Sequence, residues 1–486
     1  MLFNSFDFAV FLPIVFFLYW FVTNKNLTLQ NLLIVCSSYV FYGWWDWRFL
    51  GLIFFSTLVD YGVGRALHGE EDKRKRKILL WISIAVNLGF LGFFKYYNFF
   101  LDNFIDAFSF FGVNIGSSAL RLILPVGISF YTFQTLSYTI DVYKKKLTPS
   151  KDFIAFSAFV SFFPQLVAGP IERATHLLPQ FFNRREFKYD LAVDGMRQIL
   201  WGLFKKMVIA DNCATYANMI FENSGDYSGA ALFLGAFFFA LQIYGDFSGY
   251  SDIAIGTARL FGFDLMQNFN FPYFSRNIAE FWRRWHISLS TWFRDYLYIP
   301  LGGSKGSMWQ KVRNIFIIFI VSGFWHGANW TFVFWGALNA FYFLPLLLAK
   351  RNRNYLDGIE ANRVLPSSKV LFQILITFSL TTFAWIFFRA NNISHAFEFI
   401  SDMTTGLFDK SSYTEFIIFV KYKVKVVVLI LIMVAIIVEW LGRDGKYAIQ
   451  NAANQHRAIR WIVYFALVFI IILYSGEDQQ FIYFQF

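Results

Sequence analysis

The 486-residue chain has little charge and little cysteine. Asp, Glu, Lys and Arg make up 15% of it, against about 25% in a typical soluble domain. Its two cysteines, Cys36 and Cys213, lie far apart in apolar sequence without metal-ligand spacing, so we expect neither a disulfide nor a metal site. H-E-x-x-H and CxxC motifs are also missing from the sequence, which leaves zinc protease and thiol chemistry unsupported.

Hydrophobic residues make up 57% of the chain and aromatic residues 22%. Apolar runs long enough to cross about 30 Å of hydrocarbon recur from end to end. The sequence therefore predicts an all-α, polytopic integral membrane helical bundle with about 12 spans, plus re-entrant or interfacial helices. Because helices that share one bilayer form one bundle, we expect a single integral domain over residues 1–486.

Basic residues gather in short segments between the apolar runs. Lys and Arg outnumber Asp and Glu by 43 to 32, a net charge of +11. The pattern is typical of cytoplasmic loops and of contact with membrane lipids, and it argues against nucleic-acid binding. With Lys25 and the charged run 70–77 inside, both termini lie outside, and residues 475–486 form an extracytoplasmic tail. No basic residue precedes the apolar stretch 6–22, so we expect a retained span rather than a signal peptide.

Two stretches depart from simple spans. SFFPQLVAGPIER, residues 161–173, contains two prolines and a glycine, and predicts a re-entrant or half-buried segment, since broken backbone at membrane depth needs protein or a wet cavity around it. Lys205 and Lys206 lie in the middle of an apolar run. The sequence does not indicate what they contact.

The motif GDFSGYSDIAIG, residues 245–256, combines small residues with two carboxylates. Small residues at this spacing allow helix backbones to approach closely, and packing alone would account for the glycines. Asp246 and Asp252 need partners because carboxylates beside apolar sequence are costly. The candidate partners are Arg259, Arg283 and Arg284.

The stretch FWRRWHISLSTWFRDYLYIPLGG, residues 281–303, predicts an amphipathic segment at the cytoplasmic face. One interpretation is an interfacial helix with aromatic and basic anchors. The other is functional: Arg283, Arg284 and Arg294 contact the phosphates of a cytosolic nucleotide-bearing donor, because guanidinium groups match phosphate oxygens. The residues themselves leave both open.

His326 lies in the apolar stretch SGFWHGANWTFVFW, and His286 is a second candidate. A histidine in such a place could simply bond a backbone carbonyl. Alternatively, a neutral imidazole in a cavity can take a proton from a hydroxyl group as a general base. We take His326 as the first candidate for catalysis.

Six motifs in order carry a resemblance over nearly the whole chain. They are the opening MLFNSFDFAVFLPIVFFLYW, FPQLVAGPIER, DFSGYSDIAIG, FWRRWHISLSTWFRDYLYIPLGG, FWHGANWTFVFWG and the closing FIYFQF. Together they resemble the membrane-bound O-acyltransferase (MBOAT) family, and within it the bacterial branch that O-acetylates alginate and peptidoglycan.

The resemblance implies acyl transfer across a bacterial cytoplasmic membrane. The donor would be cytosolic acetyl-CoA or another acyl thioester, with no tightly bound cofactor. The acceptor would be an envelope polysaccharide, reached through a separate periplasmic acetyltransferase. The family's catalytic histidine corresponds to His326 and its second histidine to His286, while Tyr483 of the closing motif would be an acyl relay.

Other interpretations remain open. Without the resemblance, the closing motif reads as an interfacial aromatic anchor. A polytopic bundle with broken helices and buried charge also fits a transporter or flippase, although we see no internal repeat. A third alternative keeps the family but makes a lipid or a protein the acceptor.

Overall fold

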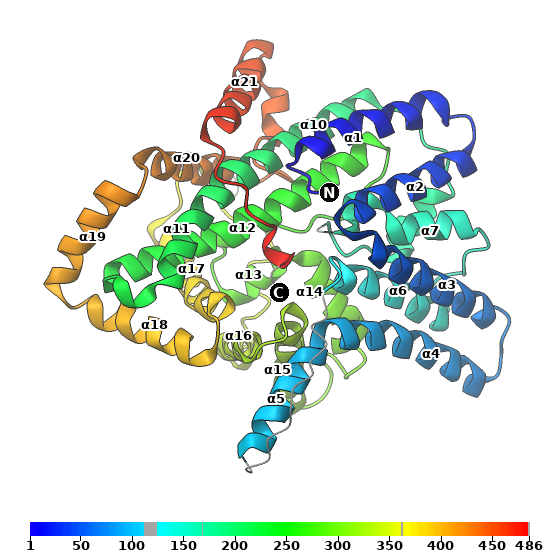
Figure 1. The fold of residues 1–486 in the computed structure, drawn as a ribbon, viewed down its shortest axis with the longest axis horizontal. Helices are drawn as coiled ribbons and strands as arrows, with labels where there is room; N and C mark the ends of the chain where they lie inside the picture. Colours follow the sequence, from blue (N-terminus) through cyan, green and yellow to red (C-terminus); the bar gives the residue numbers. More distant parts are fainter. Residues whose placement is uncertain (111–123, 168, 361–362, 485–486) are drawn as a thin grey trace. The chain divides into compact units, whose positions relative to one another are not determined.

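The computed structural model describes residues 1–110, 124–167, 169–360 and 363–484, and these residues form helices and no strands (Figure 1). The predicted all-α class is confirmed. By their internal contacts they form two compact units, unit 1 (Met1–Ala192 and Thr257–Met266) and unit 2 (Val193–Gly256 and Gln267–Phe486). Whether the chain acts as a single integral domain stays a prediction.

Unit 1 is built from apolar helices joined by polar contacts. Its α-helices are α1 (Phe6–Phe17), α2 (Leu27–Asp46), α3 (Leu50–Leu67), α4 (Lys73–Leu91), α5 (Tyr97–Phe110), α6 (Ile128–Tyr143), α7 (Phe153–Ser161), α8 (Phe163–Leu166) and α9 (Ala174–Leu177). The carboxylate of Asp60 in α3 is fully buried, and it accepts hydrogen bonds from Asn87 of α4 at 2.8 Å and from Thr139 of α6 at 3.0 Å. This carboxylate therefore ties three helices together.

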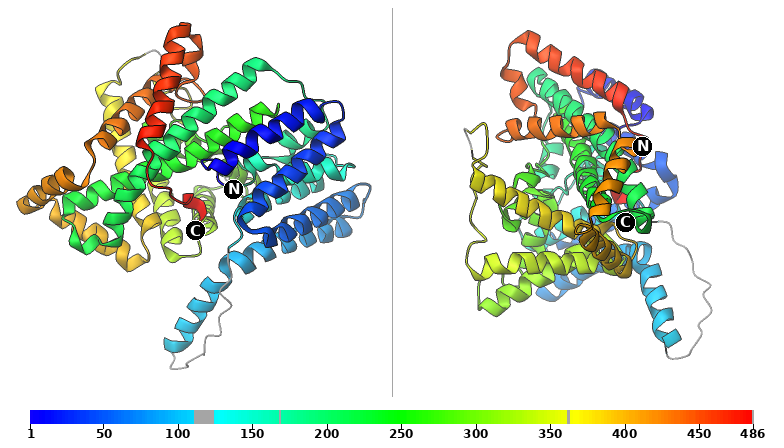
Figure 2. Two further views of the ribbon diagram at one scale, coloured as in Figure 1. Left: turned by 45° about the horizontal axis from the view of Figure 1, so that its top comes forward. Right: turned by 90° about the vertical axis from the view of Figure 1, so that its left-hand side faces the viewer.

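Helix α5 stands away from the other helices of unit 1 in both views of Figure 2. None of its residues is buried. We predicted that this Phe-rich stretch lies near the outer interface, and that position stays a prediction.

The proline-rich stretch 161–173 is broken, as its sequence predicts. α7 ends at Ser161, α8 contains only Phe163–Leu166, and residues 169–173 are not helical. The described residues of this stretch are nevertheless buried. Protein atoms therefore surround its irregular backbone, which is the condition for such backbone at membrane depth.

Unit 2 contains the remaining helices. They are most of α10 (Tyr189–Leu203) and α12 (Gly229–Leu260), with α11 (Asp211–Glu222), α13 (Ile278–Arg284), α14 (Ile287–Phe293), α15 (Met308–His326), α16 (Trp330–Leu348), α17 (Ser368–Arg389), α18 (Ile393–Gly406), α19 (Lys410–Lys423), α20 (Val426–Gly442) and α21 (Arg457–Tyr474). Two π-helical segments, η5 (Phe204–Ala210) and η8 (Arg294–Tyr298), follow α10 and α14, and a 3₁₀ turn, η10 (Ile482–Phe484), follows α21.

Glycines set the distance between α12 and α10 within unit 2. A methyl group on Gly249 would lie 2.8 Å from the carbonyl oxygen of Gly202, and one on Gly256 would lie 2.5 Å from that of Gly195. Both contacts are with backbone, which cannot swing aside. The predicted close approach of this glycine motif is confirmed.

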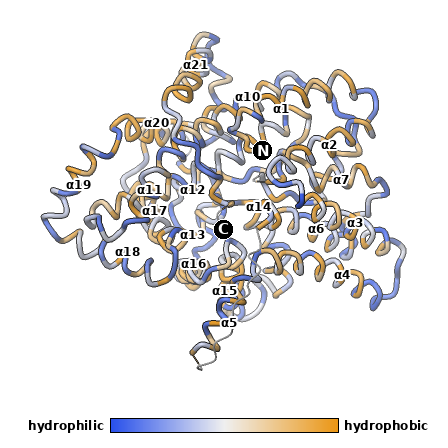
Figure 3. Tube along the Cα trace, viewed as in Figure 1, coloured by the Kyte–Doolittle hydropathy of each residue, from blue (hydrophilic) through white to orange (hydrophobic). Residues whose placement is uncertain are grey.

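Six described helical stretches are long and apolar enough to cross a membrane, or seven with the bent pair α19 and α20. This is fewer than the expected total of about 12. Two of the six, 27–67 and 73–110, have 41 and 38 residues, whereas one crossing needs about 20. Other predicted spans are short or contain buried polar groups. Figure 3 shows the contrast: α20 is mostly hydrophobic, whereas the connection between α3 and α4 is hydrophilic.

Candidate active site

His326 is the last residue of α15, immediately before the turn that leads into α16. The two helices pack closely because each has a glycine against the other's backbone. A methyl group on Gly323 would overlap the carbonyl oxygen of Phe332, and one on Gly336 would overlap that of Phe319. His326 is 3% exposed, so this tight helix pair fixes the position of its imidazole.

His286 lies between α13 and α14. Its φ of 44° is in the left-handed region, which costs energy for a residue with a side chain. Its Nδ1 lies 3.1 Å from the side-chain oxygen of Asn268, which also accepts the backbone N–H of Ser288 at 3.3 Å. A backbone N–H can only donate, so this atom of Asn268 is the oxygen, and in the neutral ring Nδ1 of His286 bears the proton. Nε2 is then the basic nitrogen.

Burial lowers the pKa of His286 to about 3. Its imidazole is therefore neutral at physiological pH. A neutral ring with a fixed tautomer can accept or relay a proton without first losing one.

Three predicted catalytic residues come together in unit 2. The ring centres of His326 and Tyr483 are 5.6 Å apart, those of His286 and Tyr483 are 6.3 Å apart, and those of the two histidines are 6.4 Å apart. Phe247 of α12 packs against this group, with its ring 4.4 Å from that of Tyr483. Burial raises the pKa of Tyr483 well above its usual value, so its phenol needs a base close by to ionise.

A cavity of about 150 Å³ reaches both histidines. Aromatic side chains form much of its wall, and Ser290 and Ser322 also line it. Tyr483 does not line this cavity. The two imidazoles therefore line the cavity and also lie beside the ring of Tyr483.

The C-terminal tail returns from α21 to this site, and Figure 1 shows its end near α14. The backbone N–H of Gly476 donates to the carbonyl of Met207 at 2.8 Å. Further along, Lys206 Nζ donates to the carbonyl of Gln479 at 3.0 Å, and the N–H of Ile482 donates to a carboxylate of α12 at 2.6 Å. The tail is thus bonded along its length.

The carboxylates of α12 have different partners from those we expected. The expected partners were Arg259, Arg283 and Arg284. Instead, Asp246 pairs with Lys206 at 2.8 Å and Asp252 pairs with Lys205 at 2.7 Å. Lys206 also pairs with Asp211 at 2.7 Å. The expectation was wrong because these lysines lie in the π-helical segment η5, against α12.

Sequence reasoning found the two lysines but not their role. Adjacent lysines in the middle of an apolar run were the available signal, since a buried cation requires an anion close by. Which of the chain's carboxylates they meet depends on tertiary packing. Asp211, just after η5, was not singled out.

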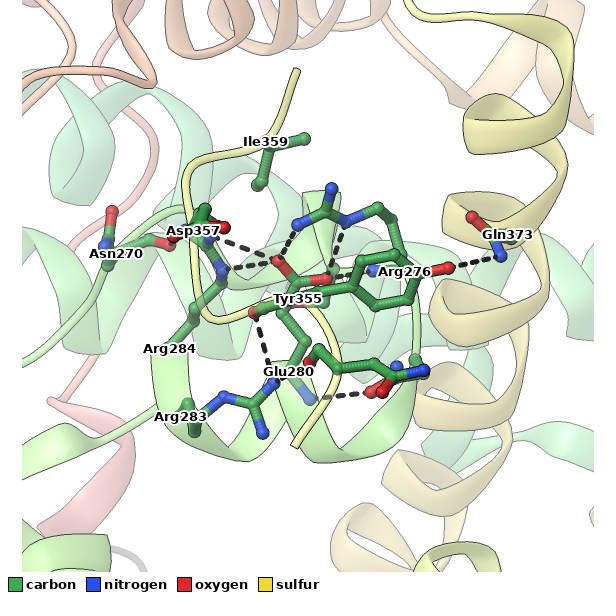
Figure 4. Close-up of polar contacts among 12 residues, drawn as sticks. Asn270, Arg276, Glu280, Arg283, Arg284, Tyr355, Asp357, Ile359 and Gln373 are labelled. Carbon is green, nitrogen blue, oxygen red and sulfur yellow. Dashed lines mark hydrogen bonds and ion pairs between the residues drawn. The ribbon is translucent and has the colours of Figure 1, made fainter. Parts of the chain in front are cut away.

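Two of the predicted phosphate-binding arginines bind the chain itself (Figure 4). Arg283 donates to the carbonyl oxygens of Asn352 and Asn354 at 2.8 and 2.7 Å. Arg284 bonds the Glu280 carboxylate at 3.2 Å and pairs with it at 3.1 Å. Arg284 also donates to the Asp357 carbonyl at 3.5 Å, so both guanidinium groups connect α13 to the segment after α16.

Arg294 is in a different environment. Its side chain is 58% exposed, and it pairs with the neighbouring Asp295 at 2.7 Å. The structure therefore does not gather the three arginines around one point. Their contact with donor phosphates stays a prediction.

Within the described ranges, no group of three or more His, Cys, Asp or Glu is placed to hold a metal ion. Cys36 is exposed and Cys213 is buried, and both are free thiols. The reactive groups that meet at this site are the imidazoles of His286 and His326 and the phenol of Tyr483.

Comparison with known proteins supplies the family. The family model "MBOAT, membrane-bound O-acyltransferase family" matches residues 149–384. A relative named probable alginate O-acetylase AlgI, from Azotobacter vinelandii, is 40% identical over 398 residues, covering 81% of this chain and 76% of the relative. Peptidoglycan O-acetyltransferase of Helicobacter pylori is 36% identical over 434 residues, covering 83% and 80%.

A more distant relative is the teichoic acid D-alanyltransferase of Bacillus subtilis, 28% identical over 290 residues, covering 57% of this chain and 71% of the relative. The region matched by the family model includes His286 and His326, and it ends before Tyr483. These matches span most of a membrane protein whose two histidines border one chamber, and they confirm the resemblance: the chain belongs to the MBOAT, membrane-bound O-acyltransferase family, and is an acyltransferase.

Proposed function

We propose that this protein moves an acetyl group from cytosolic acetyl-CoA across a bacterial cytoplasmic membrane, for O-acetylation of an envelope polysaccharide. The observation that carries the proposal is the group of His326, His286 and Tyr483, whose rings lie 5.6–6.4 Å apart. The names of the relatives support the acetyl group and the polysaccharide, because they specify alginate and peptidoglycan.

The proposed first step transfers the acetyl group to the tail. His326 takes the proton of the Tyr483 phenol, and the phenolate oxygen attacks the thioester carbonyl. The carbon–oxygen bond forms, the carbon–sulfur bond breaks, and the proton passes from the imidazole to the thiolate, which leaves as free coenzyme A. His286, held neutral with its proton on Nδ1, assists at the same centre.

The second step passes the acetyl group from Tyr483 to an acceptor outside. We propose that a separate periplasmic acetyltransferase takes the group from the tyrosine ester and places it on the polysaccharide. Basic segments keep the donor side cytosolic and both termini extracytoplasmic in this scheme. The tail, residues 475–486, would then present its tyrosine on the outer side.

The arginines would serve the donor in two ways. Arg294, which is exposed, would contact phosphate groups of acetyl-CoA directly. Arg283 and Arg284 would need to release the segment after α16 to do the same, and their bonds to it favour a role in holding the donor-side surface in shape.

The test is acetyl transfer by a His326→Ala variant reconstituted with acetyl-CoA. We expect loss of acetylation by at least about a hundredfold, since general acid–base catalysis contributes about 10²–10⁴-fold. Acetylation of Tyr483 is measured by mass spectrometry of the C-terminal peptide, and glycan acetylation is measured in cells.

Phe319→Leu is the matched control, because Phe319 lines the same cavity from α15 without an ionisable group. It should keep most of the activity. A His326→Ala variant that folds and transfers acetyl at the parent rate would refute the catalytic role.

A further inference from the structure

Two adjacent buried lysines of η5 pair with two carboxylates on α12. Lys205 is 6% exposed and Lys206 is 1% exposed, while Asp246 and Asp252 are 2% and 9% exposed. Taking such charges out of water is costly, and a buried pair that loses one member leaves an unpaired charge. Each of the two pairs therefore keeps its partner buried at a cost, and the groups that each pair contacts indicate its role.

The two pairs differ in what else they touch. Lys205 donates to Ser248 at 2.8 Å, and Asp252 accepts from Gln198 at 2.7 Å, so this pair bonds α10, η5 and α12 to one another. The Lys206 pair reaches the C-terminal tail instead. Lys206 donates to the Gln479 carbonyl at 3.0 Å.

Asp246 supplies the second attachment to the tail. Its Oδ2 accepts the N–H of Ile482 at 2.6 Å, while its Oδ1 faces Lys206. Lys206 thus binds the carbonyl of Gln479, and its partner Asp246 binds the N–H of Ile482, three residues later. Hydrogen bonds to charged groups are short and strong, and they fix direction as well as distance.

Aromatic packing alone would not set the position of the tail. The Phe481 ring lies 4.4 Å from that of Tyr250 and 6.0 Å from that of Phe247. Such apolar contacts have little directionality. A slip of one residue would move the chain by about 3.3 Å, which is more than half the 5.6 Å between the rings of His326 and Tyr483.

We propose that Lys206 and Asp246 are positioning residues that fix the register of the C-terminal tail and so hold the Tyr483 phenol beside His326. The inference rests on the proposed relay, and it adds a device for it: an ion pair that binds the tail's backbone rather than its side chains. Asp211 also bonds the Lys206 ammonium, at 2.7 Å, and so helps to fix its direction.

The test measures tail docking and tail acetylation in the full-length protein in lipid nanodiscs. For docking, Cys36 and Cys213 are replaced by alanine, and Ile482→Cys is the reporter, since Ile482 is 1% exposed when docked. We expect Asp246→Asn to raise the maleimide labelling rate about tenfold or more, because a hydrogen bond to a charged group is lost.

Asp252→Asn is the matched control on the same helix. It also removes a charge from a buried lysine pair, but its partners are outside the tail. Labelling in this control should stay within about twofold of the parent, and Asp246→Glu should restore part of the docking. Equal labelling rates in Asp246→Asn and Asp252→Asn would overturn the proposal.

Acetylation is measured separately, with Ile482 intact and acetyl-CoA as the probe. Asp246→Asn should lower the yield of acetylated Tyr483, and Asp252→Asn should not. Ile482→Pro tests the same bond from the side of the tail, because it removes the N–H that Asp246 accepts and leaves Asp246 and Lys206 intact, at the first residue of η10, where proline is tolerated. Full acetylation in Ile482→Pro would count against the proposal.

The two readouts separate the two hypotheses. If Tyr483 is never acetylated in the parent chain, the proposed relay is wrong, and the position of the tail then has no role in acetyl transfer. The labelling ratio still decides whether Lys206 and Asp246 hold the tail.

Discussion

His176 shows how two carboxylates can hold one side chain charged. Its Nδ1 lies 2.8 Å from Glu172, and its Nε2 lies 3.6 Å from Asp264. The nearby carboxylates of Asp264 and Glu172 raise the pKa of His176 from 6.5 to about 10. The stabilisation from the protonated ring is therefore complete below pH 6.5 and is lost as the pH rises toward 10.

We predict that His176→Gln lowers the melting temperature more at pH 6 than at pH 10. The parent and variant are compared by thermal unfolding in detergent at pH 6, 8 and 10. The difference between them should shrink as the pH rises, because the parent loses its charged ring over that range. A difference that is constant with pH would contradict the ion-pair account.

The same scale shows what the sequence could and could not indicate. His326, His286 and Tyr483 could be named as candidates from the sequence, because they are ionisable or phenolic groups in apolar or terminal motifs that resemble a family. The hydrogen bond from His286 to Asn268 could not be predicted, because the two residues are 18 positions apart and no spacing rule links them. Likewise, only packing decides that Asp246 meets Lys206 rather than an arginine.

At the scale of elements, the contact between α10 and α12 depends on the absence of side chains. Gly249 and Gly202 let the two backbones meet. The glycine spacing predicted this approach, since helix pairs with small residues can pack closely. It did not predict the π-helical segment η5, where the adjacent residues Lys205 and Lys206 both reach carboxylates of α12, because a change in helical turn has no simple sequence mark.

We predict that Gly249→Ala destabilises the protein by about 1–3 kcal/mol, the range for overpacking a tight interior. The added methyl would lie 2.8 Å from the Gly202 carbonyl oxygen. Gly62→Ala in α3 is the control, because a methyl there meets nothing within 4 Å. Chemical or thermal unfolding in detergent measures both, and equal stabilities would show that the helices can separate without cost.

For the whole molecule, hydropathy predicted the class, whereas six or seven described helical stretches meet the length and hydropathy of a span, against the expected total of about 12. A window of apolar residues marks a span only when the helix is straight and uniformly apolar. This chain breaks a helix at Phe162, two residues before Pro164, and bends one pair by 95° between α19 and α20. It also buries charge at Lys205 and Lys206. Such breaks, bends and buried charges make a hydropathy window less able to recognise a span.

The predicted orientation can be tested with single cysteines in a chain that lacks Cys36 and Cys213. We expect Ser475→Cys to react with a membrane-impermeant maleimide in intact cells. Lys75→Cys should react only after the cells are permeabilised, because its charged run is predicted to be cytoplasmic. The reverse pattern would invert the topology and remove the tail from the outer side.

Burial of the Lys206–Asp246 pair also determines how the tail responds to dissolved salt. Raising ionic strength from 0.1 to 1 M shortens the screening length from about 10 Å to about 3 Å, which weakens exposed pairs such as Arg48–Asp46, whose arginine is 61% exposed. Counter-ions do not enter between two side chains that are 1% and 3% exposed. The tail should therefore keep its place at high salt as well as in dilute buffer.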